Sequence, residues 1–480
     1  MDMLIDGSWT GASDGQVDLV LNPATNGQID TVPRATVADV ERAVAAAQRG
    51  KAAMCAMPAW QRYEILEAVA RRIEENQAEL GTLLCRENGK RIGETTSEVG
   101  VAARIFRGYA EEAKRIFGRS VPLNSIPGRE KSLAITTREP LGVVAAIVPF
   151  NYPVELWSHK VAGGLAAGNA VITKAPEDCP LAIIEVSRYL EEAGLPPGAH
   201  QLLTGGRDVG EALVRAEGVQ MIAMTGSTAA GKRILEVAAA TLKKVHLELG
   251  GNDATIVCGD ADIEATAAAL IAGRFTSGNG QICCAVKRVL VEKPIYQKLL
   301  DAVATKTSKL KVGDPMDPST DVGPLINLRG AERVEAQVRQ AVADGAKVVT
   351  GGVRRDNFFE PTILTGIASG TAAFADETFG PVLPLIPYER FEDALALAND
   401  SPFGLQAAIF THDLRKVMRA YEALDVGTVV VNHTTAVRVE TLPFGGNKDS
   451  GNAREGIHDT LHEMSKEKTL LLHEVFGAAA

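Results

Sequence analysis

The feature of the chain that most constrains its fold is a run of short apolar segments that alternate with helical ones between Leu141 and Met224. Strands are predicted at Leu141–Val148, Ala170–Lys174, His200–Leu203 and Met221–Met224, and helices at Val154–Ala167, Leu181–Ala193 and Val209–Arg215. Strands joined by crossover helices form a mostly parallel sheet covered by helices on both faces. The pattern therefore predicts a doubly wound α/β domain.

A second run of the same kind begins after Gly251. Its predicted strands are Ala254–Val257, Arg288–Val291, Lys347–Thr350, Gly380–Pro387 and Thr428–Val431, and its helices are Ile263–Ala272 and Tyr296–Thr307. A chain of 480 residues fits two domains of about 150–250 residues each. Between a predicted helix at Val101–Ile116 and the first strand, Ser120–Thr137 is expected to form a protruding hairpin, and Lys468–Val475 a terminal strand.

Composition excludes several classes of protein. The net charge of −10 leaves no surplus of Lys and Arg for nucleic acid or an anionic membrane. The N-terminus lacks the features of a signal peptide and the apolar stretches are too short to span a bilayer, so a cytoplasmic location is predicted. The six cysteines form no CxxC pair, and His458 and His462 have no evident third ligand, so no metal site is expected.

The candidate nucleophile is Cys283, in the segment Gly280-Gln281-Ile282-Cys283-Cys284. A cysteine after a glycine loop, at the start of a helix or tight turn, can have its thiolate stabilised by backbone N–H groups and the helix dipole. A thiolate is the form that attacks a carbonyl carbon. Taken alone, however, such a cysteine is more often a small buried hydrophobe.

Two further polar residues suit chemistry at a carbonyl group. Glu248 lies between apolar residues at a predicted strand end, where burial raises the pKa of a carboxyl group and favours a general base. Asn151 follows the strand Leu141–Val148 and offers a neutral N–H donor to an oxyanion. Each has an ordinary alternative, because glutamates cap helices or face solvent and asparagines are common in turns.

Glycine-rich segments follow three consecutive strands of the first run. They are Lys174–Glu177, Thr204–Gly206 with Gly210, and Thr225–Gly231. Strand–glycine–helix junctions bind phosphate through free N–H groups, and three of them together indicate a nucleotide site more strongly than one does. No GxxxxGK[ST] motif is present, which argues against ATP hydrolysis.

Taken together, these segments resemble the aldehyde dehydrogenase superfamily over essentially the whole chain. The matching motifs are PFNYP at 149–153, KAPE at 174–177, MTGST at 224–228, LELGG at 247–251, GQICC at 280–284, ETFGPV at 377–382 and LPFGGNKDSG at 442–451. The resemblance leans towards the lactaldehyde and non-phosphorylating glyceraldehyde-3-phosphate dehydrogenases, through Ala285–Arg288 and Phe403–Ala407.

The resemblance implies a set of roles for individual residues. Cys283 would be the nucleophile, Glu248 the base that activates water, Asn151 part of the oxyanion hole, and Lys160 its support. NAD would be the cofactor, with NADP possible, and Glu177 favours NAD because it would repel a 2′-phosphate, although Lys174 beside it could tolerate one. The cofactor-binding residues would be Ile147, Pro149, Phe150, Lys174, Glu177, Gly206, Gly210, Thr225, Gly226, Ser227, Leu249, Gly250, Glu377 and Phe379.

The resemblance also implies a domain organisation. Residues 1–119 and 139–250 would form the dinucleotide-binding domain and residues 251–449 the α/β catalytic domain. Residues 120–138 and 465–480 would form a small β element for assembly into a homodimer or homotetramer. Two alternatives are a CoA-acylating enzyme, which typically lacks the glutamate, and a non-catalytic relative, which would have lost Cys283, Glu248 or Asn151.

The substrate is expected to be a small uncharged aliphatic or aromatic aldehyde, with a semialdehyde or lactaldehyde as the alternative. The expected tunnel residues are Val101, Tyr152, Leu156, His159, Ile282, Cys284, Val437 and Phe444. Phosphate-handling members carry arginines where Val101, Ile282 and Val437 stand, and succinate-semialdehyde dehydrogenases carry one at His159. An anionic tail needs such donors. Arg104, Arg107 or Arg438 could supply one by turning into the tunnel.

Overall fold

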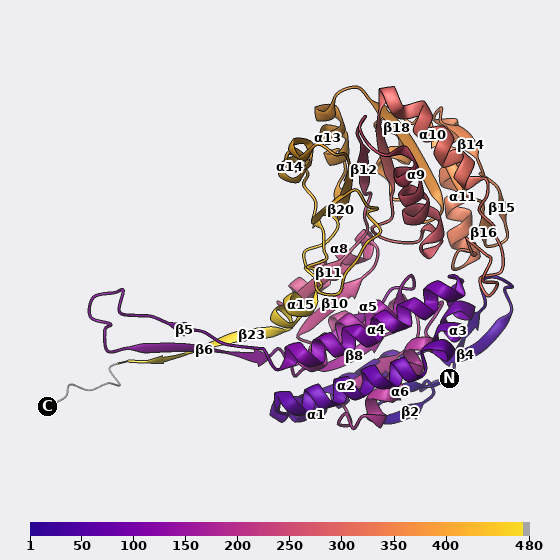
Figure 1. The fold of residues 1–480 in the computed structure, drawn as a ribbon. Helices are drawn as coiled ribbons and strands as arrows, with labels where there is room; N and C mark the ends of the chain where they lie inside the picture. Colours follow the sequence, from indigo (N-terminus) through magenta and orange to yellow (C-terminus); the bar gives the residue numbers. More distant parts are fainter. Residues whose placement is uncertain (474–480) are drawn as a thin grey trace.

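The computed structural model describes residues 1–473. These residues form two parts, each built on a seven-stranded sheet, which lie one above the other in Figure 1. The first sheet has the order β11-β10-β7-β8-β9-β1-β2. Its strands are β11 (Lys244–Glu248), β10 (Met221–Thr225), β7 (Val143–Ile147), β8 (Ala170–Lys174), β9 (His200–Leu203), β1 (Met3–Ile5) and β2 (Ser8–Thr10). The five strands from β11 to β9 are parallel, and the antiparallel pair β1–β2 extends the edge beside β9.

Helices cover both faces of this sheet because alternate residues of its strands point to opposite sides. On β7, Val143 and Ala145 pack with α1 (Val37–Ala56), α7 (Arg207–Arg215) and α8 (Thr228–Ala239). Val144 and Ala146 face the other way. They pack with α5 (Pro153–Ala166) and α6 (Leu181–Glu192), and with α2 (Ala59–Glu75), α3 (Gln77–Asn88) and α4 (Ile92–Ala113) beyond them. The predicted doubly wound α/β fold is confirmed.

The second sheet has the order β14-β17-β18-β13-β12-β20-β21. Its strands are β14 (Lys347–Thr350), β17 (Thr362–Thr365), β18 (Val382–Tyr388), β13 (Arg288–Glu292), β12 (Ala254–Val257), β20 (Gln406–Phe410) and β21 (Thr428–Val431). On one face lie α9 (Ile263–Ile271) and α10 (Lys293–Thr307), and on the other α11 (Leu328–Ala343), α13 (Phe391–Asn399) and α14 (Leu414–Ala423). Only β14 runs antiparallel to its neighbour in the described sheet.

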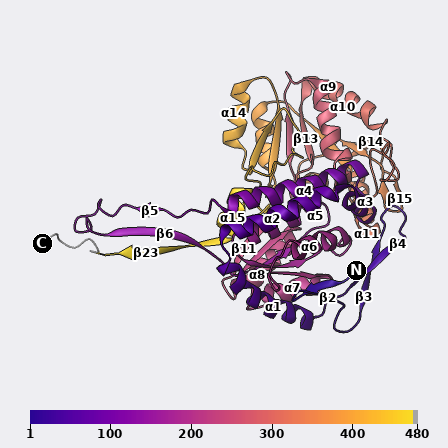
Figure 2. The ribbon, with the colours of Figure 1, turned by 60° about the horizontal axis from the view of Figure 1, so that its bottom comes forward.

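A long arm projects from the body of the molecule (Figures 1 and 2). It is a three-stranded antiparallel sheet in the order β23-β6-β5, made of β5 (Ser120–Val121), β6 (Leu133–Pro140) and β23 (Ser465–Leu472). The helix α15 (Ile457–Glu463) leads into β23. The predicted hairpin and terminal strand are therefore present, although residues 474–480, where the predicted strand ends, lie outside the described part.

The remaining elements are short. They are β3 (Val17–Leu21) paired with β4 (Gln28–Pro33), β15 (Arg354–Arg355) paired with β16 (Phe358–Phe359), β19 (Phe403–Gly404) paired with β22 (Asn447–Lys448), and α12 (Ala372–Ala375). Across residues 1–473, no helix is long and apolar enough to cross a membrane.

Candidate active site

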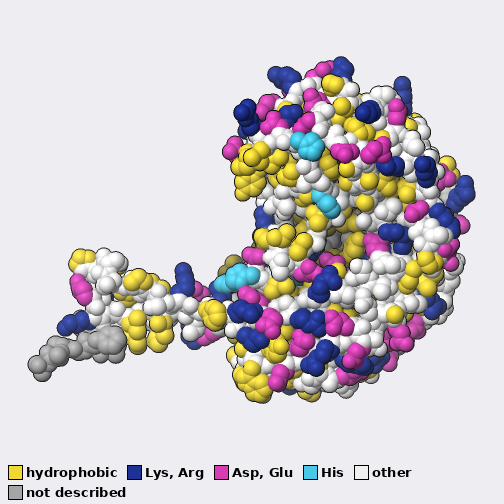
Figure 3. Space-filling model, viewed as in Figure 1, with side chains coloured by type: hydrophobic (Ala, Val, Ile, Leu, Met, Phe, Trp, Pro, Cys, Tyr) yellow, Lys and Arg dark blue, Asp and Glu magenta, His cyan; other side chains and the backbone are white. Residues whose placement is uncertain are grey.

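The residues singled out in the sequence gather where the first sheet faces the second. The strands β7, β8, β10 and β11 run parallel, so their carboxyl ends share one edge. Asn151 follows β7, Lys174 and Glu177 follow β8, and Glu248 ends β11. Figure 3 shows that the surface is hollowed between the two stacked parts of the molecule.

Cys283 lies in a turn rather than at the start of a helix. A π-helical turn at Ala272–Thr276 and a short 3₁₀ turn at Gly278–Gly280 precede it, and no helix begins at the cysteine. Of the two settings expected from the sequence, a helix start or a tight turn, the structure has the turn, so no helix dipole acts on the sulfur. The loop needs glycine at Gly280, whose φ is +76° and whose added Cβ would lie 2.5 Å from the carbonyl carbon of Gly380.

The resting sulfur of Cys283 is a thiol. A hydrogen bond with the Cys284 thiol, together with burial, raises the pKa of Cys283 well above its ordinary value. The backbone around it is fixed by Lys287, whose Nζ donates to the carbonyl oxygens of Cys283 at 2.8 Å and Gly251 at 2.9 Å. A nucleophile of this kind needs a base nearby to take its proton.

Glu248 is the carboxylate placed to be that base. Its side chain is buried, and neither carboxyl oxygen has a hydrogen-bond partner in the described structure. Burial and the charge of Glu455 raise its pKa well above the ordinary value, while Arg438 and Lys160 oppose that rise. The predicted raised pKa is thus reproduced, and the charge of Cys283 also acts on this group.

The loop that carries Asn151 is held from beneath by a buried ion pair. Lys90 and Glu98 are both fully buried and form a salt bridge. Lys90 Nζ donates to the Asn151 carbonyl oxygen at 2.6 Å, and Glu98 accepts from Val154 N at 3.0 Å at the start of α5. These contacts fix the backbone beside the candidate oxyanion hole. Sequence reasoning missed both residues, because nothing local connects α4 with the loop after β7.

A second carboxylate of α4 joins the Asn151 loop to the Cys283 loop. Glu94 Oε1 accepts from the Tyr152 hydroxyl at 2.5 Å and from Gly278 N at 2.7 Å. The ammonium of Lys90 also lies 3.6 Å from the centroid of the Tyr152 ring. One helix therefore positions both loops of the site relative to each other.

Lys160 is fully buried on α5 and belongs to a network of charges. Its Nζ lies 2.7 Å from Thr225 Oγ1 and 2.8 Å from Glu455 Oε2. The other oxygen of Glu455 accepts from Arg438 Nη2 at 2.6 Å. Burial alone would raise the pKa of Glu455, but the charges of Lys160 and Arg438 hold it well below its ordinary value. Sequence reasoning missed Glu455, which stands four residues after the LPFGGNKDSG motif.

Glu377 lies on the far side of the nucleophile loop. Its Oε1 is 2.8 Å from Lys287 Nζ and accepts from Gly251 N at 3.2 Å. An added Cβ at Gly250 would lie 2.4 Å from its other carboxyl oxygen, so a larger residue there would displace the Glu377 side chain. The Phe379 ring packs edge-on against Phe150, with centroids 5.8 Å apart. The two predicted nicotinamide-side residues thus lie beside the loops that carry Asn151 and Cys283.

A cavity of about 450 Å³ opens along the ends of β7, β8 and β10. Among the predicted cofactor residues, it is lined by Ile147, Lys174, Gly206, Gly210 and Ser227. Ser227 caps the N-terminus of α8 by accepting from Ala230 N at 3.3 Å, and that helix end faces the cavity. A helix N-terminus favours a phosphate group. Glu177 lies beside Lys174, with Oε1 3.8 Å from Nζ.

The remaining predicted cofactor residues lie on the same edge. Pro149 follows β7 directly, and Thr225, Gly226, Leu249 and Gly250 follow or end β10 and β11. Gly226 N donates to the Glu248 carbonyl oxygen at 3.0 Å, which ties these two strand ends together.

The predicted tunnel residues are only partly brought together. Tyr152, Ile282, Cys284 and Phe444 pack in one apolar cluster with Cys283. Leu156 and His159 are buried on α5, and the His159 Nδ1 lies 3.2 Å from the Tyr109 hydroxyl. Val101 packs instead against the helical core of the first sheet, and Val437 stays outside the cluster, where its neighbour Ala436 takes part.

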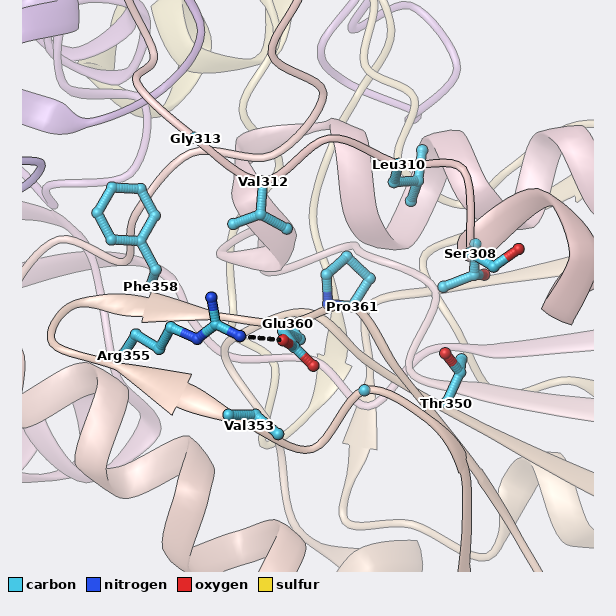
Figure 4. A pocket seen from close by; sticks show the side chains of 12 residues that line it. Ser308, Leu310, Val312, Gly313, Thr350, Val353, Arg355, Phe358, Glu360 and Pro361 are labelled. Atoms are coloured by element: carbon cyan, nitrogen blue, oxygen red, sulfur yellow. Dashed lines mark ion pairs between the residues drawn. The ribbon is translucent and has the colours of Figure 1, made fainter.

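A further cavity of about 470 Å³ lies away from these residues, between the loop after α10 and the strands β14 to β16 (Figure 4). It is lined by Leu310, Val312, Val353 and Phe358, with an Arg355–Glu360 ion pair at 3.6 Å. None of its described lining residues belongs to the predicted site.

His458 and His462 stack on α15 with ring centroids 4.5 Å apart, and His458 Nδ1 lies 2.8 Å from Glu112 Oε1. No group of three or more potential metal ligands occurs in residues 1–473.

Comparison with known proteins places this site in a family. The model of the aldehyde dehydrogenase family matches residues 9–470. The chain belongs to the aldehyde dehydrogenase family. It is therefore an oxidoreductase that acts on aldehydes and oxidises them to acids.

Individual relatives match along their full length. The chain is 41% identical to a 3-sulfolactaldehyde dehydrogenase of Priestia aryabhattai, covering 98% of both chains. It is 37% identical to a lactaldehyde dehydrogenase of Methanocaldococcus jannaschii, covering 98% of this chain and 100% of the relative. The solved betaine aldehyde dehydrogenase of Staphylococcus aureus with NAD+ is 32% identical, with a TM-score of 0.95 over 99% of this chain and 97% of that one. The lean towards lactaldehyde dehydrogenases is thus confirmed.

Proposed function

We propose that this aldehyde dehydrogenase uses NAD and is non-acylating, so that the acyl group formed on Cys283 is released by water. The observation that carries the proposal is Glu248, a buried carboxylate of raised pKa close enough to Cys283 for the two charges to interact. Water is a weak nucleophile and needs a base to attack a thioester, whereas a thiol such as CoA attacks it far more readily. Water is the natural acceptor when a base of this strength is present.

The first half of the reaction is attack on the aldehyde. As Cys283 Sγ forms a bond to the carbonyl carbon, its proton must leave, and Glu248 as a carboxylate is the base at hand. The carbonyl oxygen becomes an oxyanion, which the Asn151 side chain and the Cys283 N–H stabilise by donating hydrogen bonds. Lys160, held by Glu455 and Thr225, adds positive charge near these groups.

The second half is release of the acid. Bound NAD would supply the acceptor for the hydride that leaves the substrate carbon. Collapse of the oxyanion leaves a thioester on Cys283, and Glu248 releases to solvent the proton that it took from the cysteine. Glu248 then takes a proton from water as the water oxygen attacks the acyl carbon, and the C–S bond breaks, so that the cysteine leaves as a thiolate and the carboxylic acid is formed.

The cavity at the sheet edge fits the cofactor. Gly206, Gly210 and the N-terminus of α8, which Ser227 caps, suit a diphosphate, and the carboxylate of Glu177 suits the hydroxyls of a ribose. We assign the nicotinamide end to Glu377, Phe379 and Phe150, which lie towards Cys283. NAD+ in the Staphylococcus aureus relative supports this choice.

We also propose the domain and subunit organisation expected from the sequence. The first sheet and its helices would be the dinucleotide-binding domain and the second the catalytic domain, at the boundaries given above. The projecting arm exposes Leu470 and Leu471 to 51% and 56%, and an uncovered sheet with apolar side chains favours pairing with a second copy. Light scattering would test the homodimer or homotetramer, and the cytoplasmic location stays a prediction.

The decisive experiment is spectrophotometric detection of NADH over a panel of short aldehydes, with acid product measured in the same samples. We expect equal amounts of NADH and acid without added CoA. NADH formation that requires CoA and yields a thioester would overturn the non-acylating assignment. The absence of NADH with every aldehyde would overturn the enzymatic assignment itself.

A further inference from the structure

Arg438 packs against the apolar cluster that contains the nucleophile. Its guanidinium stacks on the Phe444 ring, with Cζ 4.6 Å from the ring centroid. Phe444 in turn packs in the apolar cluster that contains Cys283 and Ile282. The side chain is 15% exposed, which is low for an arginine in a loop. Arg438 thus turns inward, as the sequence analysis required of any arginine that is to hold an anion.

The two other arginines near the predicted tunnel face away from it. Arg104 is 59% exposed and pairs with Glu440 at 2.9 Å. Arg107 pairs with Glu67 and with Glu74 on the outer side of α4. Neither is placed to touch a substrate near Cys283. Arg104 therefore serves as a matched control for Arg438.

Carboxylates surround the guanidinium of Arg438. Lys160 and Arg438 are two buried cations that share the carboxylate of Glu455. The second carboxylate near Arg438 is Glu155, whose Oε1 lies 3.6 Å from Nε, and burial raises its pKa to about 7. Burial alone would lower the pKa of Arg438, but these carboxylates together with Glu248 raise it. Because Glu155 can accept a proton near neutral pH, it is the partner that an incoming anion would displace.

Two buried nitrogen atoms, one of Arg438 and one beside it, have no hydrogen-bond partner in the described structure. Arg438 Nε is buried and, in the described structure, donates to no acceptor. His159, one turn after Glu155 on α5, has its Nε2 buried without a partner, while Nδ1 contacts Tyr109. The charge of Arg438 acts on the pKa of His159, which places the two side chains near each other. A carboxylate or sulfonate accepts several hydrogen bonds at once and fits a guanidinium fork.

We propose that Arg438 binds an anionic group at the far end of the substrate, so that the enzyme prefers short aldehydes with a terminal carboxylate or sulfonate. The inference rests on the proposed function and names its substrate class. The anion would replace Glu155 as the partner of Nε. This substrate class differs from the uncharged tail expected from the sequence. The name of the Priestia relative, whose substrate carries a sulfonate, agrees with it.

The test uses aldehydes that differ only in charge. Succinate semialdehyde and butyraldehyde differ by a carboxylate in place of a methyl group, and 3-sulfolactaldehyde and lactaldehyde differ by a sulfonate. We expect kcat/KM in the wild-type enzyme to favour the anionic member of at least one pair by more than tenfold. The pair with the larger ratio of kcat/KM shows whether the enzyme prefers a carboxylate or a sulfonate.

The Arg438→Met variant tests whether the guanidinium is responsible for the preference for anionic aldehydes. We expect the preference for the anion to fall at least tenfold, mainly through KM, while Arg438→Lys keeps part of it and Arg104→Met keeps all of it. Any general damage through Glu455 lowers both members of a pair equally and leaves the ratio unchanged. A wild-type enzyme that prefers the neutral aldehydes, or a ratio that survives Arg438→Met, would overturn the proposal while leaving the aldehyde dehydrogenase activity established. Should the variant not fold, the wild-type ratios alone decide.

Discussion

Lys160 and Glu455 form a fully buried ion pair, with 2.8 Å between Nζ and Oε2, although 295 residues separate them in the sequence. The pair ties α5, which packs on the first sheet, to the segment that follows the second sheet. Because both side chains are out of water, removing one partner leaves an uncompensated charge rather than a mere gap. The pair therefore contributes to stability as well as to the electrostatics of Glu248.

We expect Glu455→Gln to destabilise the protein by about 3–5 kcal/mol, because Lys160 and Arg438 lose their common counter-charge. Thermal unfolding would measure the loss, with Glu440→Gln at the surface as a control. The pKa of Glu455 is lowered in the folded state, so the stabilisation is present at neutral pH and is lost as the pH falls below the ordinary carboxyl range. An unchanged melting temperature at pH 7 would show that the pair contributes nothing.

We expect Cys283→Ala and Cys283→Ser to lower aldehyde oxidation at least about a thousandfold, because no other group in the site can carry the acyl intermediate. Binding of NAD, measured by calorimetry, should survive in both variants. Cys55→Ser, at an exposed position, serves as the control. Turnover that persists in Cys283→Ala would end the covalent mechanism.

Glu248→Gln should separate the two halves of the reaction. Water attack depends on a base more than hydride transfer does, so we expect a burst of NADH followed by a steady state slower by about 10²–10⁴-fold. Because burial raises the pKa of Glu248 and the ionised form is the active base, wild-type steady-state turnover should rise with pH through that pKa. Rapid mixing at several pH values measures both effects. A variant with unchanged turnover and an unchanged pH profile would remove Glu248 from this role.

The sequence alone predicts those parts of the fold and site that local patterns determine. Ala170–Lys174 and His200–Leu203 read as strands because they are short, apolar and bounded by turn residues, and the structure has these bounds. At Cys283 the sequence left a helix start and a tight turn open. The structure has the turn, because Asn279 and Gly280 both adopt positive φ and end the 3₁₀ turn before the cysteine.

Contacts between distant segments account for what the sequence did not predict. Lys90 reaches the backbone of Asn151, and Glu455 reaches Lys160, but neither pair leaves a periodic or compositional signal. Arg438 presents the same difficulty. Its nearest neighbours in sequence are partly buried or exposed without a regular period, so only the packing on Phe444 decides which way it turns.

NAD should be preferred to NADP because of Glu177. Its carboxylate stands at the end of β8, beside the cavity and 3.8 Å from Lys174, where it can accept hydrogen bonds from ribose hydroxyls and would repel a 2′-phosphate. Lys174 opposes this preference, but burial lowers its pKa and Glu177 partly neutralises its charge. We expect Glu177→Ser to raise kcat/KM for NADP at least tenfold and to lower that for NAD.

Glu185→Gln removes the same charge from α6, outside the residues that line the cavity, and should change neither value. The test compares kcat/KM for NAD and for NADP in the wild-type enzyme and in the Glu177→Ser and Glu185→Gln variants. If the wild-type enzyme prefers NADP, Lys174 outweighs the carboxylate, and the phosphate is held in spite of Glu177. If Glu177→Ser leaves the ratio of the two cofactors unchanged, the side chain is too exposed, at 51%, for its charge to discriminate between them.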